Sequence, residues 1–205
     1  MTTLESNCTM SIVNIRYPFL LKCTDYDALK AALLPQKAHF DNFTMWGIGG
    51  YAFGYFEGQA QDKARMCTLL ETLPTSVVCL YQPGQMAVMY DNPGCVRERK
   101  DGLTYRVFAA KLKPGCADEY KRRHMTIPPL ASDQPAYESN WGIWLGDGHV
   151  FGYCECDPAL WTEPTEEIKE LTIQWETAQL EIMEWLSDDM DWLTGQKHAA
   201  VMQIL

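Results

Sequence analysis

The chain has 205 residues and a formal net charge of −10 at pH 7, and hydrophobic residues make up 47% of it. This hydrophobic content is enough to build a sizeable core, so an intrinsically disordered chain is excluded. The negative charge and the lack of a basic tract argue against binding to nucleic acid or an anionic membrane, and no stretch reaches the roughly 18 uncharged apolar residues of a membrane span.

The eight cysteines and the N-terminal segment favour a reducing compartment. No two cysteines have the CxxC spacing of common zinc sites, and the first ten residues, "MTTLESNCTM", lack the basic run and apolar segment of a secretion signal. We therefore expect free, mostly buried thiols, no metal, no cofactor and a cytoplasmic protein.

The first half of the chain is predicted to contain, in order, a strand, a helix, a hairpin, a second helix and a final strand. An apolar strand, "SIVNIRYPFLLKC", is followed by Thr24, a candidate N-cap, with Asp27 completing a capping box in front of the helix "ALKAALL". Alternating aromatic and small residues around a Gly-rich turn predict a hairpin at residues 42–58. The helix "DKARMCTLLETL" and the strand "QMAVMY" complete this half.

The second half is predicted to repeat this order. It contains the strand "TYRVFAAKL", a helix from about Cys116, a hairpin at residues 140–156, a long helix within 163–185 and a final strand, "AAVMQIL". The segment "DNPGCVRERKDG" between the halves is rich in turn formers and charge, so it is interpreted as a linker. The predicted units are 1–92, a linker at 93–103, and 104–205.

The two hairpins have similar sequences at a constant offset of 98 residues. Seven of seventeen aligned positions are identical, namely Asn42/Asn140, Trp46/Trp144, Gly50/Gly148, Phe53/Phe151, Gly54/Gly152, Tyr55/Tyr153 and Glu57/Glu155. This self-similarity favours an internal duplication, although two unrelated hairpins of shared composition remain the alternative.

Each half is therefore predicted to have the βαββαβ order of a ferredoxin-like unit. The predicted fold class is α+β. Two such sheets can bury their uncovered faces against each other, which predicts two tandem repeats forming a pseudo-dimeric α/β barrel, with a pocket between a sheet and its helices. Because this pairing occurs within one chain, we expect a monomer.

The helix entered through "KPGCADEYKRRH" holds the candidate acid–base residues. Asp118–Arg122 and Glu119–Arg123 have the spacing of ion pairs on a solvated helix face. Tyr120 and His124 are also four positions apart, so they share another stripe of the helix and could form a proton-transfer pair near neutral pH. The alternative is a buried tyrosine beside a histidine at the helix end.

The segments "KLKPGCADEYKRRHMTIPPL" and "NWGIWLGDGHVFGYCE" resemble the L-rhamnose mutarotase family, over about residues 104–205. The resemblance implies a dimeric α/β barrel, His124 as proton donor and Tyr120 as a substrate contact. Trp141 stands where the family has another substrate-binding tyrosine. The family also has a pair of consecutive tryptophans on its second helix. Trp175 matches the first of them, and Glu176 stands in place of the second. Trp161 matches a helix tryptophan that precedes this pair.

The resemblance predicts a cofactor-free isomerase that interconverts anomers of a 6-deoxy sugar or a related small molecule. Trp141, Trp144 and Trp175 could stack on the sugar ring, and Glu176 could accept a hydrogen bond from a hydroxyl group. The first half has no Tyr/His pair, so one site per chain is expected. A cyclase or isomerase of an apolar metabolite and a non-catalytic binding protein remain alternatives.

Overall fold

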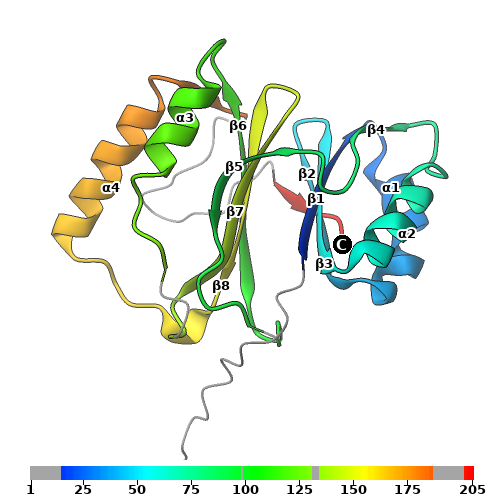
Figure 1. Cartoon of the computed structure of the whole chain (residues 1–205), viewed down its shortest axis with the longest axis horizontal. Helices are drawn as coiled ribbons and strands as arrows, with labels where there is room; N and C mark the ends of the chain where they lie inside the picture. Colours follow the sequence, from blue (N-terminus) through cyan, green and yellow to red (C-terminus); the bar gives the residue numbers. More distant parts are fainter. Residues whose placement is uncertain (1–14, 98, 131–133, 187–200) are drawn as a thin grey trace, which may run out of the picture.

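The structure, a computed structural model, describes residues 15–97, 99–130, 134–186 and 201–205. Within these residues the protein has two antiparallel sheets that face each other, with helices on the outer side of each sheet (Figure 1). This arrangement is of the predicted α+β class, and it buries apolar residues in three clusters, one between the sheets and one under each helical layer.

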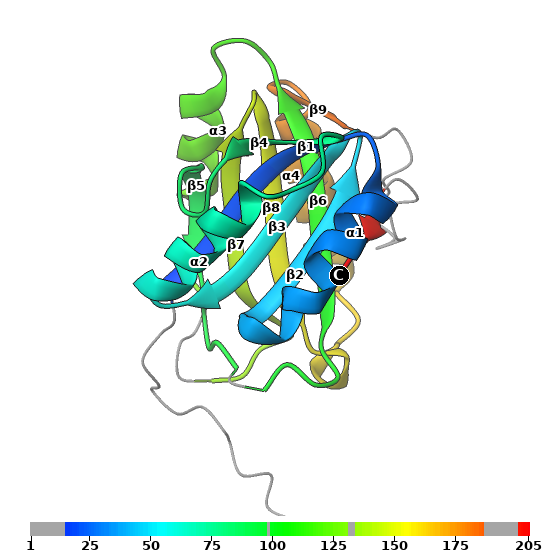
Figure 2. The same ribbon diagram turned by 90° about the vertical axis from the view of Figure 1, so that its right-hand side faces the viewer.

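The first sheet has the strand order β10-β2-β3-β1-β4. Its strands are β1 (Ile15–Cys23), β2 (Asp41–Ile48), β3 (Tyr51–Gly58), β4 (Val77–Tyr81) and β10 (Met202–Gln203). Two helices, α1 (Tyr26–Leu33) and α2 (Ala60–Leu70), cross its outer face (Figure 2), and the 3₁₀ helix η1 (Leu34–His39) follows α1.

The second sheet has the order β5-β7-β8-β6-β9. Its strands are β5 (Ala87–Asn92), β6 (Thr104–Leu112), β7 (Glu138–Gly146), β8 (His149–Cys156) and β9 (Met183–Trp185). The helices on its outer side are α3 (Ala117–His124) and α4 (Glu166–Gln179), and η2 (Pro158–Leu160) follows β8.

Both predicted hairpins form, because their turn residues adopt the left-handed conformation that a two-residue hairpin turn requires. Gly49 and Gly50 have φ values of 56° and 85°, and Asp147 and Gly148 have values of 51° and 72°. The cap of α1 differs from the prediction. Asp25, not Thr24, is the N-cap, and its carboxylate accepts a hydrogen bond of 2.9 Å from the amide of Ala28.

The edge strands of the two sheets are exchanged between the halves. The segment "QMAVMY" leads into β5, which pairs with β7 of the second half, and Met202 and Gln203 of "AAVMQIL" form β10, which pairs with β2 of the first half. The prediction that these segments close the sheets of their own halves is wrong; β4 and β9 pair with β1 and β6 instead. An apolar strand pattern indicates a strand but not its partner, and an exchanged strand covers an edge that would otherwise expose unpaired backbone groups.

The cysteines are mostly as expected. Cys23, Cys154 and Cys156 are buried and free, and Cys67, Cys79 and Cys116 are free and partly buried. Cys95 is disulfide-bonded, so the expectation of free thiols is wrong at this position. Cys8, residues 11–14 of the first predicted strand and residues 199–200 of the last lie outside the described residues.

Aromatic residues from equivalent places in the two hairpins meet between the sheets. The Tyr55 and Tyr153 rings stack with centroids 4.1 Å apart, and the Phe53 and Phe151 rings stack at 5.5 Å. These side chains are fully buried, so the sequence positions that repeat at an offset of 98 residues form the contact between the two sheets. Stacked aromatic pairs contribute roughly 0.5–1.5 kcal/mol beyond the area that they bury.

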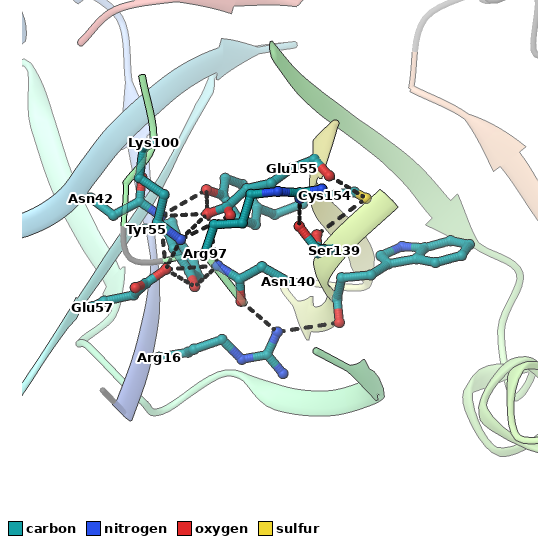
Figure 3. A network of polar contacts seen from close by, with 12 residues as sticks. Arg16, Asn42, Tyr55, Glu57, Arg97, Lys100, Ser139, Asn140, Cys154 and Glu155 are labelled. Carbon is teal, nitrogen blue, oxygen red and sulfur yellow. Dashed lines mark hydrogen bonds and ion pairs between the residues drawn. The ribbon is translucent and has the colours of Figure 1, made fainter. Parts of the chain in front are cut away.

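A buried polar cluster lies at one end of this aromatic contact (Figure 3). We call it the inter-sheet carboxylate cluster. It contains Asn42, Tyr55, Glu57, Lys100, Asn140, Tyr153 and Glu155. Burial raises the pKa of both tyrosines, and the nearby carboxylates raise it further, so their hydroxyl groups stay protonated and donate to the carboxylates.

The hydrogen bonds of this cluster cross between the sheets in both directions. Asn42 of the first sheet donates to Glu155 of the second at 2.7 Å, and Asn140 of the second donates to Glu57 of the first at 2.7 Å. The Lys100 ammonium donates to both oxygens of Glu155 at 2.8 Å. Asn42 and Asn140 have φ values of 48° and 53°, a conformation that asparagine tolerates better than most residues. The cluster therefore joins the sheets by charge-assisted hydrogen bonds.

Replacement of Glu155 is expected to destabilise the protein strongly. Its side chain is 0% exposed, and Glu155→Ala leaves the Lys100 ammonium and the donors of Asn42 and Tyr153 without their shared acceptor. Breaking a buried charged pair costs about 3–5 kcal/mol. Urea unfolding of the two proteins measures this difference.

Glu163→Ala is the matched control, because Glu163 forms an exposed ion pair with Lys169. Its loss is expected to change the free energy of unfolding by about 0–1 kcal/mol. Equal effects of the two substitutions would contradict a role for the cluster in holding the sheets together.

Candidate active site

The helix α3 has a charged outer face and an aromatic inner face. Arg122 and Arg123 both bond to Glu119, at 2.7 and 2.8 Å, and these bonds lower the pKa of its carboxyl to about 2. The predicted pairing of Asp118 with Arg122 is not observed, because Glu119 accepts from both arginines. Arg123 also pairs with Glu181, so this outer face ties α3 to the end of α4.

Tyr120 and His124 point to the inner side of α3 and are 2% and 5% exposed. Their rings stack with centroids 4.1 Å apart, and His124 Nδ1 lies 2.9 Å from the carbonyl oxygen of Tyr120. Because a carbonyl oxygen only accepts, Nδ1 carries the hydrogen and the neutral ring keeps its lone pair at Nε2. Burial lowers the pKa of His124, partly opposed by this backbone bond, so the neutral ring is favoured at neutral pH.

The inner face of α4 places further functional groups beside His124. The Trp175 ring meets the His124 ring edge-on at 5.3 Å. The next residue, Glu176, has a carboxyl whose pKa is raised to about 7 by burial, although Arg106 opposes the shift. Burial and then the charge of Glu176 raise the pKa of Tyr120. The predicted residues Tyr120, His124, Trp175 and Glu176 therefore come together.

Gln179 is a member of this group that the sequence analysis missed. It is 2% exposed, and both polar atoms of its carboxamide lack a hydrogen-bond partner. It follows Trp175 by four positions and Glu176 by three, so helical periodicity puts all three on one face of α4. This spacing was the only feature of the sequence that pointed to Gln179. Glutamine is common on exposed helix surfaces, so the sequence did not indicate that this side chain is buried.

Several polar groups of this site lack partners. Within the part of the chain that the structure describes, no side-chain hydrogen bond is formed by the Tyr120 hydroxyl, Nε2 of His124 or the Glu176 carboxylate. The carboxamide of Gln179 is the fully buried group among them, and buried polar groups in folded proteins are nearly always hydrogen-bonded, so its lack of a partner calls for an explanation. A hydroxylated ligand between α3, α4 and the second sheet would supply the missing partners.

The strand β5 forms another wall of the site. The Tyr90 ring lies 5.7 Å from the His124 ring and 5.2 Å from the Trp141 ring. Asn92 donates to the Tyr90 hydroxyl at 2.6 Å and accepts from the amide of Leu130 at 2.9 Å. Tyr90 and Asn92 also line an open cleft of about 320 Å³ between β5 and α3. These two residues were missed because β5 was assigned to the other sheet.

The remaining predicted tryptophans lie in three different environments. Trp141 is partly buried on the helix side of the second sheet, where it contacts Tyr90. Trp144 packs between the sheets, 6.1 Å from Phe53 and 6.0 Å from Tyr55, so the structure does not bring it to His124. Trp161 is 54% exposed and packs on Tyr137 at 4.8 Å.

The corresponding space under the helices of the first sheet is filled by phenylalanines. Phe40 and Phe56 meet at 5.2 Å, and Phe43 and Phe19 pack against them. This cluster is buried and contains no histidine. The core under the helices of the first sheet is therefore apolar, unlike the aromatic and polar group around His124.

Comparison with known proteins gives one family match. Residues 106–203 match the family model of L-rhamnose mutarotase, which confirms the resemblance seen in the second half of the chain. The matched segment contains α3 and α4, which hold Tyr120, His124, Trp175 and Glu176. Searches of curated proteins and of solved structures gave no match.

Two further features bear on the site. In the described residues, no group of three or more His, Cys, Asp or Glu side chains is arranged to hold a metal ion. None of the helices in the described ranges is both long and apolar enough to cross a membrane.

Glu176 is expected to make stability fall as the pH rises. Its pKa is about 7 in the folded protein against 4.5 for an unperturbed carboxyl, so the folded state binds more protons between these values. The free energy of unfolding therefore decreases across this window, by up to about 3 kcal/mol, and the loss is complete above about pH 8. Glu176→Gln should remove this decrease, as measured by urea unfolding from pH 4 to 8.

Glu170→Gln is the control, because Glu170 is exposed on the same helix and reports the removal of one surface carboxylate. If wild type and Glu176→Gln lose stability in parallel across the window, Glu176 does not hold a proton in the folded state.

Proposed function

We propose that this protein is a cofactor-free isomerase that interconverts the anomers of a 6-deoxy sugar of the L-rhamnose type by acid–base catalysis. The observation that carries the proposal is the unpaired buried carboxamide of Gln179 on α4, on the same helix face as Trp175, whose ring meets that of His124 on α3; both helices lie in the segment that matches the mutarotase model. A sugar carries several hydroxyl groups and an apolar ring face. The polar side chains of this site can bond to the hydroxyl groups, and the Trp175 ring can pack on the apolar face.

Interconversion requires the sugar ring to open and close again. The anomeric hydroxyl loses a proton, its electrons form the carbonyl, and the bond from the anomeric carbon to the ring oxygen breaks as that oxygen gains a proton. Reclosure on the other carbonyl face reverses these steps. An acid and a base within hydrogen-bond reach are sufficient, and each such group contributes about 10²–10⁴-fold in rate.

His124 and Glu176 can divide these two tasks. The lone pair at Nε2 of neutral His124 accepts the proton of the anomeric hydroxyl, since Nδ1 is fixed by the Tyr120 carbonyl. Glu176, with a pKa of about 7, is partly protonated near neutral pH and can donate to the ring oxygen. This assignment differs from the role of proton donor that the family resemblance implies for His124. Groups with perturbed pKa values in one site are a recognised mark of acid–base pairs.

Tyr120 has a supporting role in this scheme. Burial and the charge of Glu176 raise its pKa, so the hydroxyl remains protonated and can donate a hydrogen bond to a sugar oxygen. Its ring also supports the His124 ring from one side. Trp175 and Trp141 offer flat apolar faces for the sugar ring. The unpaired Glu176 and Gln179 groups favour a polyol over an apolar metabolite as substrate.

We also infer that the chain is a tandem duplication that forms a pseudo-dimeric barrel and acts as a monomer. The repeated residues of the two hairpins occupy corresponding positions in the two sheets, and each sheet receives an edge strand from the other half. The linker 93–103 separates units 1–92 and 104–205, and within its described residues it has no helix or strand.

The proposal predicts faster exchange between the two anomers of L-rhamnose, measured by NMR saturation transfer with the purified protein. His124→Ala is expected to lower the catalysed rate by at least about 100-fold, because the base is lost. Tyr120→Phe should lower it less, since the stacked ring remains.

Arg122→Ala is the matched control on the same helix. Among the described residues Arg122 bonds to Glu119 alone, on the exposed face, and the rate of this variant should equal that of the wild type. Wild-type protein that gives no acceleration over buffer would rule out L-rhamnose as the substrate. A rate that persists in His124→Ala would remove the assigned base.

Gln179 is expected to affect substrate binding more than the chemical step. Gln179→Leu removes two unpaired buried polar atoms, so the folded protein should be at least as stable as the wild type. The L-rhamnose concentration for half-maximal exchange should rise about tenfold with little change in maximal rate, since one hydrogen bond is worth about 0.5–1.5 kcal/mol. An unchanged half-maximal concentration would exclude Gln179 from the substrate contacts.

A further inference from the structure

A second cavity lies at the first sheet, away from His124. It has a volume of about 390 Å³, within the range of small-molecule sites, and opens where η1, the start of β2 and β10 meet the linker. Its polar lining consists of Lys37, Asn42, Thr44, Lys100, Tyr105 and Gln203. Asn42 and Lys100 also belong to the inter-sheet carboxylate cluster and are seen beside Glu57 in Figure 3.

Thr44 provides the first sign that this cavity takes a ligand. Its side chain is 4% exposed, and its hydroxyl oxygen has no hydrogen-bond partner. The pairing of β2 with β3 is irregular between Asp41 and Thr44, and Asn42 has a φ of 48°, so the backbone turns locally at this point. At the corresponding position of the second hairpin, 98 residues later, stands Gly142, which has no hydroxyl. A buried hydroxyl without a partner is unfavourable unless something binds to it.

The charges of the lining indicate the kind of ligand. Lys37 forms no ion pair within the described part of the chain, whereas the Lys100 ammonium is held by both oxygens of Glu155. The carboxylates of Glu57 and Glu155 lie behind Lys100 and Asn42 and do not line the cavity. The surface that faces a ligand therefore carries ammonium groups, a hydroxyl and carboxamides, next to the rings of Phe40 and Phe43.

We propose that this cavity binds a small hydroxycarboxylate, whose carboxylate pairs with Lys37 and whose hydroxyl groups bond to Thr44 and the nearby carboxamides. An ammonium without a counter-ion matches the carboxylate, and a charge-assisted bond of this kind is about twice as strong as a neutral one. The site is separate from the sugar site, since its lining comes from η1, β2, β10, the linker and β6 rather than from α3 and α4.

Gluconate and sorbitol are a matched pair of probes, because both have six carbons and several hydroxyl groups but only gluconate carries a carboxylate. Isothermal titration should give a dissociation constant on the order of 1 mM for gluconate. Sorbitol and acetate should each bind at least about tenfold more weakly. Saturating L-rhamnose should leave the gluconate affinity unchanged. Equal affinity for gluconate and sorbitol, or competition by L-rhamnose, would overturn the proposal.

Two substitutions localise the binding. Lys37→Met should weaken gluconate binding about tenfold, whereas Lys30→Met, which changes an exposed lysine of α1, should have no effect. Thr44→Val should weaken binding about three- to tenfold and raise the melting temperature of the ligand-free protein, because an unpaired buried hydroxyl is removed. Thr44→Ser keeps the hydroxyl and should restore binding.

The combination of weaker binding and greater stability in Thr44→Val separates a ligand contact from a structural role, which would lower stability instead. Gluconate affinity that is unchanged in both Lys37→Met and Thr44→Val would place the ligand elsewhere and overturn the assignment. Activity towards L-rhamnose is measured separately, so the gluconate-binding test can succeed or fail whether or not the protein acts on L-rhamnose.

Discussion

The inter-sheet carboxylate cluster is the constraint on which the arrangement of this protein depends. Glu57 and Glu155 are buried between two sheets, and each accepts a hydrogen bond from an asparagine of the opposite sheet. Charges in such a place are unfavourable unless every bond is made, so the cluster tolerates few relative positions of the sheets. Stacking of the Tyr55 and Tyr153 rings alone would allow the two sheets to slide past each other by a small distance. The hydrogen bonds from the tyrosine hydroxyl groups and the asparagines to the carboxylates are directional, so they prevent this movement.

With the two sheets held in this arrangement, their helix-covered outer faces differ in composition. Under α1 and α2, phenylalanines and other apolar residues fill the space. Under α3 and α4, Tyr120, His124, Glu176 and Gln179 present polar groups in a largely buried environment, and burial lowers the pKa of His124 while it raises the pKa of Glu176 to about 7. The strand β5 comes from the first half of the chain but pairs with β7 in the second sheet. It therefore places Tyr90 next to His124, in the wall of the candidate site.

The sequence was sufficient for the local elements and for half of the site. Alternating aromatic residues and the glycine turns placed both hairpins, and the spacing of Tyr120 and His124 put them on one side of α3, where they stack. Trp144 shows the limit of such reasoning. It lies three residues from Trp141, and the alternation of a strand turns the two side chains to opposite faces, so only Trp141 shares the side of His124. Gln179 and Tyr90 could not be found from the sequence, because neither residue type is unusual and both acquire their role through burial against distant elements.

What the sequence by itself determined is the set of local structures, the repeated hairpin residues and the family match of the second half, because these depend on residue type and on spacing along the chain. Only the tertiary structure decided which strands close each sheet, which cations meet Glu155, and which polar groups remain unpaired beside His124 and in the cavity of Thr44. The reason is physical. Strand partners, desolvation and hydrogen-bond satisfaction are set by residues far away in sequence, and their energies exist only when the two sheets are in contact.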